Sequence, residues 1–188
     1  MKSVLILGGW KANAQAGWMP WLIQWLGQRA IPHHFCQLPY TWAPSTVLGV
    51  RLALQKAKEL PGPKVIVCHS FGGKVALKAL SENDLPIDGL IMVAPLYRWP
   101  LSKWFPFWKD YVNFEQLKKN CPRIIVIHSK DDNLVPFLNS LELVRKCKEY
   151  GIEVEFCVHQ TSGHFDPKSH CFELPEVVEA YEKICASS

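Results

Sequence analysis

The sequence lacks a long apolar run. No stretch approaches the roughly 20 consecutive apolar residues that a membrane-spanning helix needs. Near the N-terminus, the apolar run of residues 4–7 stops at two glycines, which makes it too short for the hydrophobic region of a signal peptide. We therefore expect no association with a membrane and no secretion signal.

Paired cysteines and runs of one charge are also missing. The seven cysteines are an odd number and form no C-x-x-C pair, which argues against a disulfide framework and predicts reduced thiols in a cytoplasmic protein. The net charge is only +4, and no basic run is longer than Lys118-Lys119. Nucleic-acid-binding proteins usually carry a stronger basic stripe, so nucleic acid is not an expected partner. Repeats and low-complexity segments are absent from the sequence as well.

The composition that remains is that of an ordinary globular protein. With 188 residues, 48% of them hydrophobic and 20% charged, the chain can bury one substantial core, and we predict a single domain over residues 1–188. The eight tryptophans are many for this length and predict an aromatic-lined surface or cavity.

Short apolar runs alternate with segments of helical periodicity. The predicted strands are residues 3–9, 33–39, 64–70, 89–95, 123–129 and 154–159, and the predicted helices are residues 17–28, 46–60, 73–83, 137–151 and 174–185. Strands made almost entirely of Val, Ile and Leu are typical of a sheet buried on both faces. The pattern predicts an α/β fold with about six mostly parallel strands and helices on both faces. In such a fold a ligand binds at the carboxyl ends of the strands.

One aromatic-rich segment interrupts this alternation, at about residues 97–120. It leaves the fourth strand at its carboxyl end, and Pro100 and Pro106 disfavour a regular helix at its start. We interpret it as a short lid or pocket wall, with an aromatic plug over the sheet edge as the alternative. The predicted pocket residues are Trp99, Trp104, Phe107 and Trp108.

The third predicted strand runs directly into a helix through Cys68-His69-Ser70-Phe71-Gly72. A serine at such an abrupt turn is typical of a nucleophile elbow, G-x-S-x-G, in which the flanking positions must be small. Cys68 replaces the first glycine of this pattern. The turn lifts the hydroxyl of Ser70 above the sheet and aims the first amides of the helix at the same point, where they favour developing negative charge.

A serine needs a base, and the base needs an orienting acid. In this arrangement the acid and then the histidine follow the serine along the chain, each in a loop after a strand. After the fifth strand, Asp131 and Asp132 compete for the role of the acid, and the pattern D-x-x-V-P favours Asp132. After the sixth strand, His164 follows a glycine that permits a tight loop, so we predict it to be the base.

The other histidines have structural interpretations. His159 ends a strand, and His170 lies beyond a proline. His69 should point away from Ser70 and serve either in packing or in supporting a residue that contacts the substrate. A metal site built from His159, His164, His170 and Cys171 would use the histidine that the serine requires, and we therefore predict neither a metal nor an organic cofactor.

An oxyanion hole completes the predicted site. The amide of Phe71, directly after the serine, is the first expected donor. The second should come from the loop after the first strand, where the amides of Gly9 and Trp10 are the two candidates. The sequence leaves the choice between these two open.

These motifs resemble those of the small serine hydrolases of the retinoblastoma-binding protein 9 / YdeN type, within the α/β-hydrolase superfamily. The resemblance covers nearly the whole chain and includes "GGW...GW..WL", the "HSFGG" elbow, "CPRIIVIHSKDDNLVP" and "SGHF". It implies a minimal α/β-hydrolase fold, with Ser70 as nucleophile, Asp132 as acid and His164 as base. We expect hydrolysis of small acyl esters, thioesters or activated amides. The alternative is a weakly active or inactive module that binds a protein or peptide.

Overall fold

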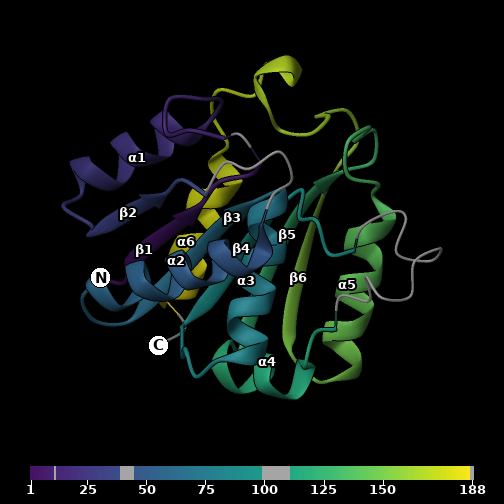
Figure 1. The fold of residues 1–188 in the computed structure, drawn as a ribbon. Helices are drawn as coiled ribbons and strands as arrows, with labels where there is room; N and C mark the ends of the chain where they lie inside the picture. The colour runs from purple at the N-terminus through teal and green to yellow at the C-terminus, as the bar shows by residue number, and fades with distance from the viewer. Residues whose placement is uncertain (11, 39–44, 99–110, 187–188) are drawn as a thin grey trace.

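The chain folds around one six-stranded sheet with helices on both sides (Figure 1). The computed structural model describes residues 1–10, 12–38, 45–98 and 111–186. Its strands are β1 (Ser3–Leu7), β2 (His33–Cys36), β3 (Lys64–His69), β4 (Gly89–Val93), β5 (Arg123–Ser129) and β6 (Glu153–His159). Its helices are α1 (Met19–Gln28), α2 (Thr46–Glu59), α3 (Phe71–Glu82), α4 (Phe114–Asn120), α5 (Leu138–Glu149), the 3-10 turn η2 (Pro167–Ser169) and α6 (Pro175–Ala186).

The strands lie in the order β2-β1-β3-β4-β5-β6, and every neighbouring pair is parallel. The predicted α/β architecture with six strands is therefore confirmed, and the described sheet is entirely parallel. The register pairs Leu7 with Cys68 and Cys68 with Met92, so the carboxyl ends of β1, β3 and β4 lie level. Strand order reverses between β1 and β3, the position at which open α/β sheets bind ligands.

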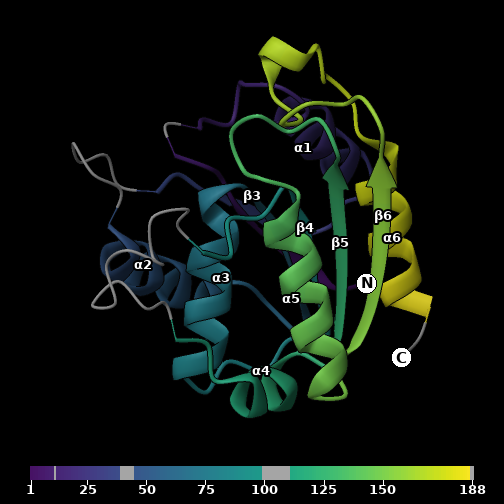
Figure 2. The same ribbon diagram turned by 90° about the vertical axis from the view of Figure 1, so that its right-hand side faces the viewer.

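The two faces of the sheet carry separate hydrophobic cores. Helices α2, α3 and α5 cover one face and α1 and α6 cover the other, as Figure 2 shows in edge view. Leu77 of α3 and Leu143 of α5 are buried in the first core, and Leu22 of α1 and Val177 of α6 in the second. Burial on both faces explains why β1 and β4 consist almost entirely of apolar residues. Within the described ranges, no helix combines the length and apolarity needed to cross a bilayer.

Helix α4 occupies part of the segment predicted to be a lid. Its N-cap Asn113 accepts a hydrogen bond from the amide of Gln116, and its buried Leu117 joins the core beneath α3. In both views α4 lies at the opposite end of the sheet from the loop after β6 (Figures 1 and 2). Residues 99–110 of the predicted lid, which include the predicted pocket residues Trp99, Trp104, Phe107 and Trp108, lie outside the described residues.

Candidate active site

Ser70 is the single residue between β3 and α3. Its backbone has φ 52° and ψ −120°, a conformation that an L-residue other than glycine rarely adopts. Two hydrogen bonds hold it there: the amide of Ser70 donates to the Val93 carbonyl at 3.0 Å, and the amide of Leu96 donates to the Ser70 carbonyl at 2.9 Å. The end of β4 thus keeps the serine in a strained turn that lifts its side chain above the sheet.

Small residues make room for this turn. A Cβ atom placed on Gly72 would lie 2.3 Å from the carbonyl oxygen of Leu7, so β1 and α3 can approach this closely only with glycine there. Cys68 occupies the place of the first elbow glycine, and the strained turn forms despite its side chain. Cys68 is fully buried, and burial raises the pKa of its thiol, so the thiol is held in its unreactive protonated form.

Asp132 and His164 come together from the loops after β5 and β6. The Nδ1–H of His164 donates to Oδ2 of Asp132 at 2.7 Å. The same oxygen accepts from Nε2 of His128 at 3.0 Å, and Oδ1 accepts from the amides of Leu134 at 2.8 Å and Val135 at 2.9 Å. Burial by itself would raise the pKa of Asp132, but the hydrogen bonds from His128 and His164 outweigh burial and lower it. The carboxylate is therefore ionised, and each of its oxygens accepts two hydrogen bonds.

Asp131, the competing acid, has a different set of partners. Its Oδ1 accepts from the hydroxyl of Ser129 at 2.5 Å and from the amide of Gly163 at 2.9 Å. The Ser129 oxygen in turn accepts from the amide of Ser162 at 2.8 Å. Asp131 thus fastens the loop that carries His164 to the end of β5, and it is Asp132 that contacts the imidazole.

His69 lies against the same histidine. Its Nε2–H donates to the backbone carbonyl of His164 at 2.9 Å, and its ring meets Trp18 edge-on, with centroids 6.1 Å apart. Burial and the neighbouring His164 lower the pKa of His69 to about 4, so the ring is neutral at pH 7. The packing role expected from the sequence is present, but His69 also lines the pocket described next and fixes the position of the His164 backbone.

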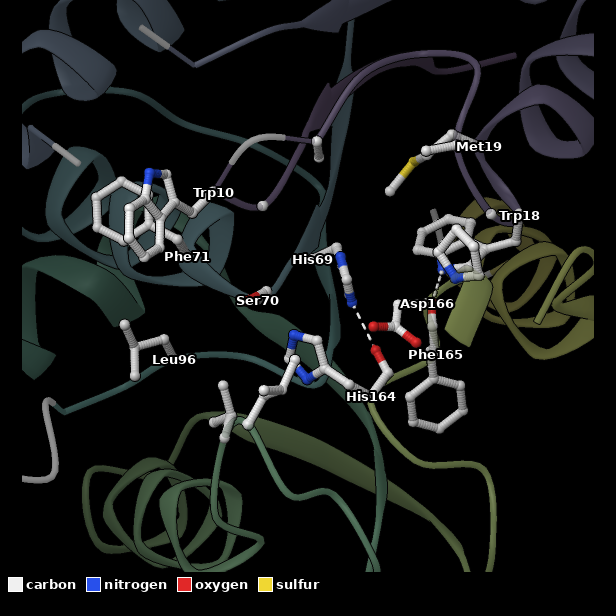
Figure 3. Close-up of a pocket in the computed structure, with 17 residues that line it drawn as sticks. Trp10, Trp18, Met19, His69, Ser70, Phe71, Leu96, His164, Phe165 and Asp166 are labelled. Carbon is white, nitrogen blue, oxygen red and sulfur yellow. Dashed lines mark hydrogen bonds between the residues drawn. The ribbon is translucent and has the colours of Figure 1, made fainter. Parts of the chain in front are cut away.

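A cavity of about 430 Å³ opens over these residues (Figure 3). Ser70 and His164 both line it, together with Gly9, Trp10 and Phe71, the three residues predicted to supply oxyanion donors. Phe71 is the first residue of α3, so its N–H has no acceptor within the helix. Within the described part of the chain, the Ser70 hydroxyl makes no hydrogen bond. Serine and imidazole thus share a wall of the cavity without the bond that would join them.

Three buried apolar residues beside this cavity come from segments that the sequence had indicated for other reasons, as the source of oxyanion donors and of the base. Trp18 is the N-cap of α1 and Met19 is the first residue of that helix, whereas Phe165 lies in the loop after β6. The indole N–H of Trp18 donates to the carbonyl of Phe165 at 3.1 Å, which joins the two loops across the cavity. The polar groups of this cavity are therefore set among aromatic side chains.

His159 and His170, the other two histidines considered in the sequence, lie outside the cavity. Nδ1 of His159 lies 2.9 Å from the hydroxyl of Ser162, and its Nε2 lies 3.1 Å from Glu176. His170 ends η2 in the left-handed conformation. Among the residues the structure describes, no group of three His, Cys, Asp or Glu side chains could hold a metal ion. All seven cysteines are free thiols.

Known proteins resemble this chain in sequence and in fold. The family model described as "Serine hydrolase" matches residues 4–183. The protein YdeN of Bacillus subtilis (strain 168), named as a hydrolase, is 25% identical over 182 residues, which are 95% of this chain and 93% of YdeN. The crystal structure of the B. subtilis ydeN gene product has a TM-score of 0.85 at 23% identity and covers 99% of this chain and 100% of that chain.

A more distant solved structure shows ferulic acid bound to Est1E from Butyrivibrio proteoclasticus. It has a TM-score of 0.71 at 13% identity and covers 100% of this chain and 89% of Est1E. These similarities confirm the predicted α/β-hydrolase fold and the YdeN part of the predicted resemblance. The retinoblastoma-binding protein 9 part stays a prediction.

Proposed function

Because the chain belongs to the serine hydrolase family, we propose that it cleaves small acyl esters, thioesters or activated amides through an acyl-enzyme on Ser70. One observation carries this proposal: the strained serine shares a cavity with an imidazole whose other nitrogen is bound to a buried carboxylate at 2.7 Å. A serine hydroxyl, an imidazole and a carboxylate are the three groups that acyl transfer needs in this order.

In the proposed first step, Oγ of Ser70 attacks the substrate carbonyl carbon while its proton moves to Nε2 of His164. The carbonyl electron pair moves onto oxygen, and Asp132 stabilises the imidazolium that forms. The tetrahedral intermediate then expels the leaving group, which takes the proton from His164. Water attacks the acyl-enzyme by the same route, with His164 again as base, and releases the acid and free Ser70.

For this step, rotation about the Cα–Cβ bond of Ser70 must bring Oγ within reach of Nε2. Such bonds are often long in an unoccupied site and tighten when substrate binds. The developing oxyanion would be held by the amide of Phe71 and by that of Gly9 or Trp10, each worth about 3–4 kcal/mol in transition-state stabilisation. No metal or organic cofactor takes part in this scheme.

The cavity walls indicate the kind of acyl group. Trp10 and Leu134, whose side chains are 47% and 59% exposed, line the same cavity as Ser70, and such apolar surface suits an apolar or aromatic acyl chain of modest size. The binding of ferulic acid to the structurally similar Est1E fits such a preference. Trp99, Trp104, Phe107 and Trp108 stay predicted members of the pocket wall, and location in the cytoplasm likewise stays a prediction.

A second candidate is a module that kept these residues but turns over poorly and holds a protein or peptide partner. The Ser70 hydroxyl, which makes no hydrogen bond among the described residues, is the observation that favours it. A cavity that reaches Ser70 favours the enzyme instead.

Two experiments test the proposal. A fluorophosphonate should form a covalent adduct on Ser70 of the folded protein, located by mass spectrometry, and Ser70→Ala should remain unlabelled. A panel of p-nitrophenyl esters of increasing acyl length should be hydrolysed by the wild type and not by Ser70→Ala. Equal rates for the two proteins, or no adduct, would refute the enzyme and favour the binding module.

A further inference from the structure

We propose that His128 is a positioning residue for the Asp132–His164 pair: it holds the carboxylate in place and limits how strongly that carboxylate stabilises the protonated imidazole of His164. This inference rests on the proposed function. His128 is the next-to-last residue of β5, and its side chain is fully buried. Since its side chain does not line the cavity, it acts through the two groups near the site that it contacts, the carboxylate of Asp132 and the carbonyl of Val135.

The hydrogen bonds of His128 account for both of its ring nitrogens. Nε2 lies 3.0 Å from Oδ2 of Asp132 and 3.1 Å from the carbonyl oxygen of Val135, and Nδ1 lies 2.6 Å from the hydroxyl of Ser140 in α5. A carboxylate and a carbonyl can only accept, so Nε2 carries a hydrogen. A ring held at both nitrogens in a fully buried place has one orientation, and that orientation aims a donor at Asp132.

Two imidazoles therefore donate to one oxygen. Oδ2 of Asp132 receives the hydrogen of His164 at 2.7 Å and that of His128 at 3.0 Å, whereas Oδ1 is occupied by two backbone amides. A donor to an anionic oxygen draws negative charge toward itself. The His128 hydrogen bond consequently reduces the charge that Oδ2 offers to His164, so that the imidazolium is stabilised less and gives up its proton more readily.

The other titratable side chains near Asp132 and His164 have partners of their own. Asp131 faces the backbone of Gly163 and the Ser129 hydroxyl, and Asp166 accepts from Ser169. His69, neutral and buried, packs on His164 with ring centroids 4.8 Å apart. None of these groups donates a hydrogen bond to Asp132. Replacing His128 therefore removes one of the two donors to Oδ2 and leaves the other, His164, in place.

The test compares His128→Leu with His128→Gln. Leucine removes the donor, whereas the amide of glutamine can place an N–H near the position of Nε2. For His128→Leu we expect the acid limb of the pH profile of kcat/KM to move upward by about 0.5–1 pH unit, because Oδ2 then stabilises only the imidazolium. We also expect kcat per active site to fall by about tenfold through the lost restraint on the carboxylate. KM should not change, and His128→Gln should recover most of both effects.

The controls separate this inference from folding and from the proposed function. Active sites are counted with a fluorophosphonate, so that misfolded protein does not enter kcat, and urea unfolding reports stability. If His128→Leu lowers only stability, with the acid limb at its wild-type position, the positioning role is overturned while the serine mechanism stands. If the wild type itself neither labels nor hydrolyses esters, the proposed function has failed, and the inference fails with it.

Discussion

Replacing Gly72 by alanine should break the turn that carries Ser70. The added Cβ would lie 2.3 Å from the Leu7 carbonyl oxygen and 2.8 Å from that of Gly8. Carbon and oxygen rarely approach closer than about 3.3 Å, so β1 and α3 must separate by about 1 Å. Both obstacles are backbone atoms, which cannot rotate aside as a side chain can.

We expect the cost of this separation at the upper end of the range for an overpacked core, about 3 kcal/mol in the free energy of unfolding. The two displaced elements also carry groups of the site, since Gly9 follows β1 and Ser70 precedes α3. A misplacement of about 1 Å in catalytic groups lowers rates by about 100-fold, so we expect ester hydrolysis per folded molecule to fall at least that far.

Urea unfolding followed by circular dichroism measures the first effect, and p-nitrophenyl ester hydrolysis measures the second. Gly27→Ala is the matched control, because Gly27 lies in the last turn of α1 and a Cβ there meets nothing within 4 Å. That variant should be neutral or up to about 1 kcal/mol more stable. A Gly72→Ala protein that unfolds at the wild-type urea concentration and keeps its rate would refute the steric argument.

Three further predictions concern neighbouring groups. Asp132→Asn should lower kcat by about 10³–10⁴-fold, since the amide no longer supports the correct imidazole tautomer. Asp131→Asn keeps an accepting oxygen, so its kcat should stay within about twofold of the wild type. Equal losses of kcat in the two variants would contradict the assignment of the acid. His69, with its pKa lowered to about 4 from 6.5, binds a proton in the unfolded chain before it does so in the native state. Its contribution to the free energy of unfolding is therefore complete above pH 6.5 and is lost as the pH falls toward 4, by up to about 3 kcal/mol. Urea unfolding of His69→Gln should show no such loss. If the stability of the wild type and of His69→Gln changes with pH in the same way, the argument is wrong. Cys68→Gly should lower the free energy of unfolding by about 2 kcal/mol through lost burial and leave the rate of ester hydrolysis per active site unchanged. A rate that rises or falls tenfold would show that residue 68 shapes the elbow.

The periodicity of the sequence predicted the strands and most helices because burial dictates it directly. Helix α4 was missed: it is short and follows a segment whose prolines and aromatics suggested irregular chain. What defines it is a local cap at Asn113 and the packing of Leu117 under α3. The packing of Leu117 depends on the completed fold, so it could not be predicted from the local sequence.

The candidate site was predictable where chemistry imposes a chain order. Ser70, Asp132 and His164 could be chosen because each follows a strand, and the structure places all three at one rim; their catalytic roles stay predictions. His128 was missed. A signal was available, since a histidine in an otherwise apolar strand must find buried hydrogen-bond partners. The loop after β1 was expected at the site as a source of oxyanion donors, but the contact between Trp18 and Phe165 had no signal, because it depends on how two loops far apart in the sequence meet.

The two hydrogen bonds between Ser70 and the β4 end have a thermodynamic consequence. They anchor the reactive corner to an interior strand of the sheet, where the backbone separates from its neighbours only in global unfolding. Fraying of an edge strand would leave the corner intact, whereas release of β4 lets the torsion at residue 70 relax. Heat inactivation of ester cleavage and loss of ellipticity should consequently share one midpoint, so that turnover serves as a gauge of the fully native population.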